Sequence, residues 1–147
     1  MTDLVSPSRP SSATYPALAV LAAVRSLDAA FNAGDLDGVL QHYEPDALLV
    51  VQPGVTVSGP DALRRVFPAL MNLGSGVHVV ESTVLASGDL ALLLARWTIR
   101  RSQADGGVRD DVEVATSVLR RRADGRWRLV IDNAFGPRLL EAASAGG

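Results

Sequence analysis

The stretch AFNAGDLDGVLQHYEPDALLV, residues 30–50, restricts the possible folds of this chain more than any other part of its sequence. Gly34 suits the left-handed backbone that ends a helix, and Asp35, directly after it, can cap a second helix. The apolar residues of this short second helix share one face: Leu36, Val39, Leu40 and Tyr43. Pro45 is expected to end it, and the apolar run at 47–52 predicts a strand. Two helices joined by a tight turn therefore lead directly into a sheet.

The helix that precedes this turn is expected to begin at Thr14 or Tyr15. Its apolar residues recur at helical spacing: Val20, Val24, Leu27 and Phe31. Because this pattern continues past Arg25 and Asp28, the apolar run at 15–24 is interpreted as part of an amphipathic core helix. It is not interpreted as a leader peptide, and no stretch has the length of a membrane span.

The second half of the chain contains one more helix and a series of strands. VTVS follows the first strand as a short partner, and Ser58 and Asp61 have the spacing of a capping box for a third helix. Apolar residues of that helix are expected to face inward: Leu63, Val66, Phe67 and Leu70. Glycine-containing turns then separate four predicted strands, at 76–87, 90–102, 109–122 and 127–135. This order predicts an α+β domain at 14–138, with flexible tails at 1–13 and 139–147.

Composition narrows the possible functions. The 147 residues are 48% hydrophobic and 20% charged, with a formal net charge of −2, which does not favour a polyanion-binding role. All 14 basic residues are arginine, which indicates a bacterial source, and a cytoplasmic location is expected. The sequence contains no cysteine, and His42 and His78 lack metal-ligand spacing, so no metal site is predicted. The basic run RRRADGRWR is expected to be a solvated hairpin, and no nucleic-acid partner is predicted.

The order of elements, together with FNAGDLDGVLQHYEPDA and RRADGRWRLVIDN, resembles the NTF2-like superfamily over residues 15–136. The resemblance is to the branch that holds ketosteroid isomerases and SnoaL-like polyketide cyclases. It implies three N-terminal helices packed on a curved, mainly antiparallel six-stranded sheet that forms a cone. It also implies an apolar pocket at the open end of the cone and a homodimer formed through the sheet.

The residues that the resemblance assigns to ketosteroid isomerase chemistry are absent. The position of the oxyanion tyrosine falls on Leu27, that of the catalytic base on Val51 or Gln52, and that of a second acid near Ser117. Tyr43 matches an accessory tyrosine of that group. Since none of the three working groups is present, we predict that the chain is not a ketosteroid isomerase.

The comparison with SnoaL-like cyclases is different. It places their acid/base aspartate on Asp132, while their partner histidine falls near Val118. Strict strand alternation gives two faces, one with Trp127, Leu129, Ile131 and Asn133 and one with Arg128, Val130 and Asp132. By burial alone the first face lines the pocket, but the second could also be apolar in a dimer interface. Asp132 therefore either enters the cone as a desolvated acid/base group or pairs with an arginine outside it.

Further candidates for the pocket are Tyr43, Gln52, Arg96, Trp97, Ser117 and Asn133. Arg96 lies in the apolar strand LALLLARWTI, so it is expected either to bridge to an internal acid, the favoured interpretation, or to hold an anionic ligand. Trp97 is expected in the core or an interface, and Gln52 can offer an amide but cannot act as a base.

The sequence thus predicts a cofactor-independent protein that binds a small hydrophobic molecule and has no membrane partner. One hypothesis is acid/base chemistry on a hydrophobic carbonyl or polyketide-like compound, with Asp132 as the catalytic group. The alternative is a non-catalytic binding or assembly module of the same fold.

Overall fold

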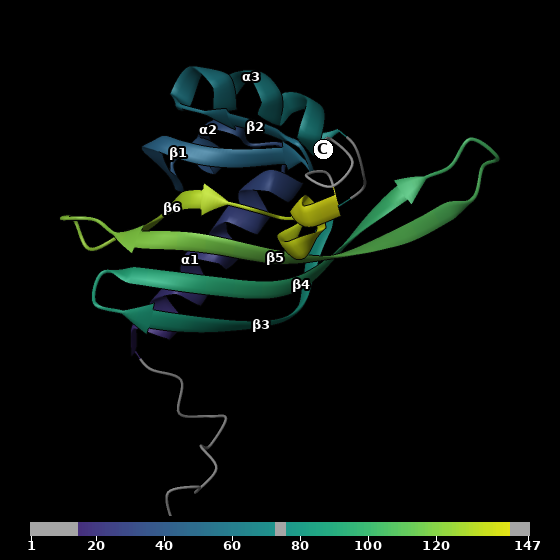
Figure 1. Cartoon of the computed structure of the whole chain (residues 1–147). Helices are drawn as coiled ribbons and strands as arrows, with labels where there is room; N and C mark the ends of the chain where they lie inside the picture. Colours follow the sequence, from purple (N-terminus) through teal and green to yellow (C-terminus); the bar gives the residue numbers. More distant parts are fainter. Residues whose placement is uncertain (1–14, 73–75, 142–147) are drawn as a thin grey trace, which may run out of the picture.

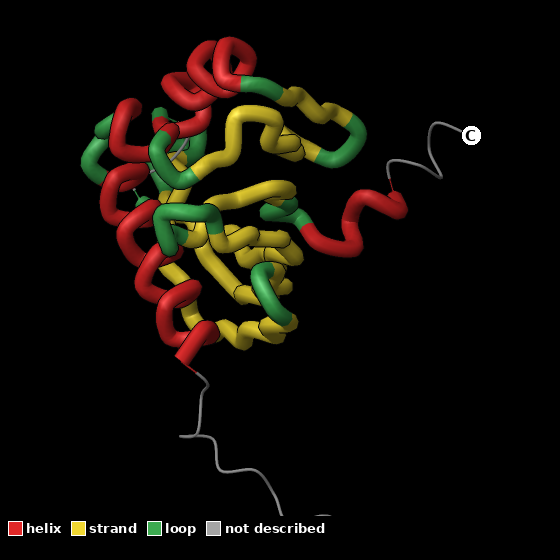
Figure 2. Tube along the Cα trace, turned by 90° about the vertical axis from the view of Figure 1, so that its left-hand side faces the viewer, coloured by secondary structure: helices red, strands yellow, loops and turns green. Residues whose placement is uncertain are grey.

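The computed structural model describes residues 15–72 and 76–141. They form an α+β domain in which the three α-helices cover one face of a curved, six-stranded sheet (Figures 1 and 2). The helical elements are α1 (Tyr15–Asn32), α2 (Leu36–Leu40), α3 (Pro60–Met71) and the short η2 (Gly136–Arg138). The strands are β1 (Tyr43–Gln52), β2 (Val55–Ser58), β3 (Val77–Ser87), β4 (Leu90–Ser102), β5 (Val108–Arg121) and β6 (Trp127–Asp132). The predicted fold class is confirmed. The tail predicted at 1–13 lies outside the described residues, and so does the tail predicted at 139–147 except for its first three residues.

The turn between α1 and α2 forms as predicted. Gly34 has a φ of 71°, in the left-handed region, and the Asp35 carboxylate accepts a hydrogen bond of 3.0 Å from the Gly38 N–H. The predicted end of α2 is wrong, because Tyr43 already belongs to β1. The His42 carbonyl accepts a hydrogen bond from the Leu129 N–H, so pairing with β6 ends the helix before Pro45 is reached.

Pro45 lies inside β1, where the pairing with β6 is irregular between Tyr43 and Leu48. A proline is tolerated at such a position because no ladder hydrogen bond needs its missing N–H. The capping box predicted for α3 does not form either. Ser58 pairs with Leu48 in the sheet, and Gly59 takes the N-cap position without a side-chain hydrogen bond.

The sheet has the order β2-β1-β6-β5-β4-β3. β1 and β6 run parallel and every other neighbouring pair is antiparallel. α1 packs across β3 and β6, and α3 packs on β1 and β2. The core lies between these helices and the sheet, and its residues include Val20, Val39, Leu63, Phe67, Leu93, Leu119 and Leu129.

The β4–β5 hairpin reaches well beyond the rest of the sheet (Figure 1). β4 pairs with β3 only as far as Ile99, while its pairing with β5 continues to Ser102. The sheet is therefore open at this end, and the cavity described next lies between it and the helices.

Candidate active site

A cavity of about 760 Å³ lies between the helices and the sheet. This is a typical volume for a small-molecule site. Most of its wall is apolar, with side chains that include Leu27, Phe31, Leu49, Phe67, Leu70, Leu93 and Ala95. The polar groups of its buried part are few, and they come from α1, β1, β5 and β6: Asp28, Tyr43, Ser117 and Asp132. The cavity is therefore mainly apolar, with a few polar groups in its buried part.

A β-bulge in β6 turns Asp132 toward this cavity. Leu119 and Val118 of β5 are adjacent, yet they pair with Leu129 and Ile131 of β6, which leaves Val130 as an extra residue. The extra residue reverses the alternation of side chains along the strand. As a result, Leu129 and Asp132 both line the cavity, whereas Ile131 is exposed on the other face. The strict alternation expected from the sequence, with Leu129 and Ile131 on the same face, is therefore wrong here.

Two hydrogen bonds hold the Asp132 carboxylate. The Tyr43 hydroxyl donates to Oδ2 at 2.5 Å, and the Ser117 hydroxyl donates to Oδ1 at 3.3 Å. The parallel pairing of β1 with β6 brings Tyr43 beside the end of β6, and β5 supplies Ser117 as the other neighbour. Both donors are buried, so the carboxylate has a fixed orientation inside an apolar wall.

Asp28 of α1 is a second carboxylate in the same cavity, and sequence reasoning did not assign it a role. Within the described part of the chain its side chain has no hydrogen-bond or ion-pair partner. Burial, together with the negative charge of Asp132, raises the pKa of Asp28 from 3.8 to about 6. Its position did carry a signal: Asp28 follows Val24 by four residues and so lies on the apolar face of the helix.

Burial raises the pKa of both Asp132 and Tyr43. Burial raises the pKa of Asp132, although the hydrogen bonds from Tyr43 and Ser117 oppose this effect. Burial and the neighbouring carboxylates raise the pKa of Tyr43 well above its ordinary value of 10.0, so its hydroxyl stays protonated and remains a donor. Carboxyl groups of raised pKa that face one apolar space are typical of acid–base sites.

The other candidates from the sequence divide into two groups. Gln52 and Trp97 line the cavity, and the Trp97 indole N–H donates to the Ala134 carbonyl at 2.8 Å. Arg96 does not line it. Its guanidinium forms an ion pair with Glu81 at 2.7 Å, so the favoured bridge to an acid is present, but half of the Arg96 side chain is exposed and the pair is not buried. The alternation of β4 explains this, since Ala95 and Trp97 face the cavity and Arg96 the opposite side.

Asn133 is buried but is not part of the cavity wall. Its amide donates to the Thr116 hydroxyl and the Gly136 carbonyl, and its side-chain oxygen accepts from the Phe135 and Gly136 N–H groups. These bonds connect the end of β6 to η2, so the structure gives Asn133 a structural role in place of the predicted pocket role. All the positions matched to ketosteroid isomerase chemistry line the cavity. Leu27 and Val51 carry no polar group, and Gln52 and Ser117 carry an amide and a hydroxyl where that chemistry has a carboxyl group.

The described residues contain no candidate metal-ligand cluster and no candidate membrane-spanning helix. Among them, no group of three or more histidine, aspartate or glutamate side chains could hold a metal ion. Within the same part of the chain, no helix is long and apolar enough to cross a membrane. The arginines of the RRRADGRWR hairpin form ion pairs, including Arg122 with Glu44 at 2.8 Å and Arg121 with Asp89 at 2.7 Å.

Residues 23–130 match the SnoaL-like domain family. The chain belongs to that family. Solved structures agree with this assignment at the level of the fold. A ketosteroid isomerase-like protein from Erwinia carotovora atroseptica is 23% identical over 82% of this SnoaL-like chain and 95% of its own, with a TM-score of 0.67. An NTF2-like protein with a cystatin-like fold from Novosphingobium aromaticivorans is 21% identical over 86% of each chain, with a TM-score of 0.69.

A candidate dehydratase of the NTF2-like family from Streptomyces avermitilis is also similar. It is 21% identical over 79% of the SnoaL-like chain and 92% of its own, with a TM-score of 0.66. No curated protein matches the chain. These likenesses confirm the predicted resemblance to the NTF2-like superfamily, and at such identities they establish the fold alone.

Proposed function

We propose that this SnoaL-like protein is a cytoplasmic bacterial enzyme that transfers protons on a small hydrophobic carbonyl compound without a cofactor. The reaction would be an isomerisation or an elimination of water. One observation supports this most strongly: Asp132, held by Tyr43 and Ser117, shares an apolar cavity with Asp28, whose carboxylate has no partner among the described residues. A carboxylate that only stabilised the fold would be expected to pair with a cation, and no arginine in residues 15–72 and 76–141 forms an ion pair with either group.

The two carboxyl groups differ in a way that suits proton transfer. We infer that Asp132 is the ionised partner, because two hydroxyl groups donate hydrogen bonds to its carboxylate and its charge raises the pKa of Asp28. Asp28 keeps its proton up to about pH 6. Asp132 then takes a proton from the carbon next to the carbonyl, and Asp28 gives one to the resulting enolate or to a leaving hydroxyl group. The Tyr43 hydroxyl stays neutral but has a single proton, so it can donate a hydrogen bond to the developing oxyanion only once Asp132 has been protonated and no longer accepts from it.

Proton exchange tests this proposal without knowledge of the natural substrate. A hydrophobic ketone with acidic α-protons, such as 2-tetralone, is incubated with the protein in D₂O, and the loss of its α-proton signal is followed by NMR. We expect the wild type to accelerate exchange, and Asp132→Asn to slow it by about 10²-fold or more. Asp28→Asn should also slow it. Asp46→Asn, which changes an exposed carboxylate on β1, is the matched control and should have no effect.

Two results would contradict this proposal, and the first of them would favour the alternative of a non-catalytic binding module. The first is a ketone that binds, seen as line broadening, but exchanges no faster than in buffer. The second is acceleration that survives in the Asp28→Asn and Asp132→Asn double variant. Thermal unfolding of each variant shows whether lost exchange reflects lost chemistry or lost structure.

We also propose that two copies associate through the outer face of the sheet. The strand register places Leu85, Leu92, Val118 and Ile131 in one row across β3, β4, β5 and β6. Three of these side chains, Leu85, Leu92 and Ile131, are more than one-third exposed. An apolar row of this kind is typical of a protein–protein interface. We expect a dimer mass by light scattering and a monomer for Leu92→Glu, whereas Val108→Glu, far from the row, should leave the dimer intact.

A further inference from the structure

The exposed part of the cavity wall carries an unusual arrangement of charges. On the cavity side of the β4–β5 hairpin, three cross-strand pairs follow one another: Trp97 with Glu113, Ile99 with Asp111, and Arg101 with Arg109. Both arginines line the cavity. Two arginines placed directly opposite each other on one face of a sheet repel, which costs stability unless an anion lies between them.

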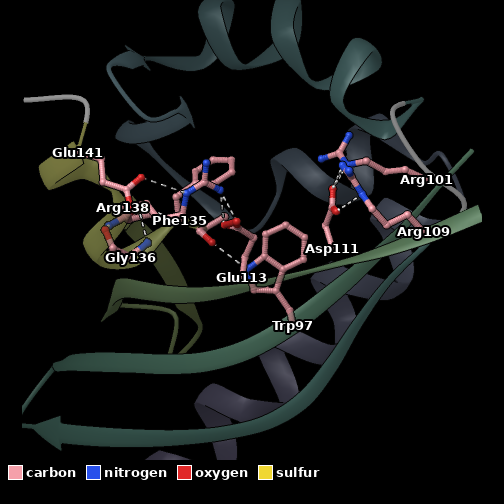
Figure 3. Close-up of polar contacts among 11 residues, drawn as sticks. Trp97, Arg101, Arg109, Asp111, Glu113, Phe135, Gly136, Arg138 and Glu141 are labelled. Carbon is pink, nitrogen blue, oxygen red and sulfur yellow. Dashed lines mark hydrogen bonds and ion pairs between the residues drawn. The ribbon is translucent and has the colours of Figure 1, made fainter. Parts of the chain in front are cut away.

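Asp111 supplies that anion only in part (Figure 3). Arg101 Nε lies 2.7 Å from one oxygen of Asp111, and Arg109 Nε lies 2.7 Å from the other. Two positive charges therefore share one negative charge. Arg101 uses only its Nε in this contact, so its two terminal nitrogens have no hydrogen-bond partner in the part of the chain that the structure describes. An excess positive charge with free donors thus faces the cavity.

A neighbouring cluster shows that this excess is specific to the Arg101–Arg109 pair. On the other side of Trp97 in Figure 3, Arg138 pairs with Glu113, whose carboxylate is well buried, and also approaches Glu141 at 3.8 Å. That cluster has no excess of positive charge. The two arginines on Asp111 are therefore the cationic feature of the cavity wall among the described residues.

We propose that Arg101 and Arg109 bind an anionic group of the ligand. This inference rests on the proposed function, which accounts for the carbonyl end of the ligand. It narrows the substrate class to hydrophobic carbonyl compounds that carry a carboxylate or a similar anion. A guanidinium with two free terminal N–H groups can bind a carboxylate in a bidentate manner. Asp28 and Asp132 repel an anion from the buried part of the cavity. The anionic end thus stays at the arginines, and the carbonyl end enters between the carboxylates.

A pair of fluorescent probes that differ by one charge tests this. Anilinonaphthalene sulfonate carries an anionic sulfonate, and N-phenylnaphthylamine has the same aromatic skeleton without it. Both gain fluorescence in an apolar site, and competition between them shows whether they share it. At low ionic strength we expect the anionic probe to bind the wild type roughly fivefold to tenfold more tightly than the neutral one. Salt at about 1 M should remove most of this preference.

Three variants separate charge recognition from a structural role. Arg101→Gln should abolish the preference for the anionic probe and leave the neutral probe unchanged. Arg100→Gln is the matched control, because Arg100 pairs with Asp110 and does not line the cavity. Asp111→Asn should increase the preference, since it removes the shared negative charge. A merely structural ion pair would instead lose ligand affinity in both Arg101→Gln and Asp111→Asn.

The outcomes also distinguish this inference from the proposed function. Equal affinity for the two probes, or equal effects of Arg101→Gln and Arg100→Gln, would overturn the anion site while ketone exchange by Asp132 could still be observed. Decreased affinity for the anionic probe in Asp111→Asn would overturn it as well. If neither probe binds in competition with the other, both the anion site and the proposed hydrophobic pocket are wrong.

Discussion

Replacing Asp28 with asparagine should stabilise the protein at neutral pH, which is the opposite of what a core substitution usually does. The folded state raises the pKa of Asp28 from 3.8 to about 6, so folding opposes ionisation of this group. Since each tenfold change in proton affinity is worth about 1.4 kcal/mol, the difference corresponds to about 3 kcal/mol at most. The carboxylate faces an open cavity where water screens its charge, so we expect about 2 kcal/mol.

The pH dependence of this effect has a defined sign. Below pH 3.8 Asp28 is protonated in both the folded and the unfolded chain, so the substitution should change little. Between pH 3.8 and about 6 the unfolded chain loses the proton while the folded chain keeps it, so wild-type stability falls as pH rises. Above about pH 6 both states are ionised and the full difference remains. The Asp28→Asn variant avoids this cost because an amide does not ionise.

Urea denaturation at about pH 3.5 and pH 7.5 measures this directly. We expect Asp28→Asn to have an unfolding free energy close to that of the wild type at the lower pH, and about 2 kcal/mol higher at the upper pH. The latter corresponds to a rise in Tm of about 4–8 °C. Asp46→Asn, at an exposed position, should show neither change. In an Asp132→Asn background the gain should shrink, because part of the effect comes from the charge of Asp132.

An equal gain at both pH values would refute this reasoning, because the effect would then not depend on ionisation. A loss of stability at pH 7.5 would do the same, and it would indicate that the Asp28 carboxylate has a favourable partner. If the prediction holds, the wild type is less stable than it would be without two carboxylates in one apolar space. A loss of folding stability of this kind is typical of a functional site.

Three further outcomes follow from the described contacts. The carboxyl carbon of Asp132, followed by NMR, should titrate above the ordinary value of 3.8, because burial raises its pKa. Tyr43→Phe should raise the midpoint further, because it removes a hydrogen bond to the ionised form. A midpoint at or below 3.8 would contradict the desolvated site. Gly136→Ala should lower the free energy of unfolding by about 2 kcal/mol or more, because its Cβ would lie 2.5 Å from the Val114 carbonyl oxygen at a φ of 55°. Gly125→Ala is the control: it has open space at a φ of 84° and should lower the same quantity by only about 1 kcal/mol. Urea denaturation measures both. No turnover of a 3-oxo-Δ5-steroid is expected in an absorbance assay, because Leu27 stands where an oxyanion donor is needed and Val51 or Gln52 where a base is needed. Rapid turnover would show that this alignment is out of register.

Local chemistry was enough to predict the order of the elements. The α1–α2 turn depends on Gly34 and Asp35, which act within a few residues of themselves, and the long hairpins depend on glycine-containing turns. The prediction from local pattern was wrong where a residue pairs with a strand that is distant in the sequence. Tyr43 continued the apolar face of α2 in the sequence, yet pairing with Leu129 placed it in a strand. Ser58 had capping-box spacing but was taken up by β2.

The sequence singled out Asp132 through its resemblance to SnoaL-like cyclases, but the direction of its side chain was a tertiary property. Direction along a strand depends on register, and the extra Val130 that turns Asp132 inward shows only in the pairing of β6 with β5. The partnership of Asp132 with Tyr43, 89 residues earlier, and the approach of Asp28 are likewise contacts between elements far apart in the chain. Burial changes the pKa of these carboxyl groups only once the helices have closed over the sheet, because desolvation needs the whole wall of the cavity at once.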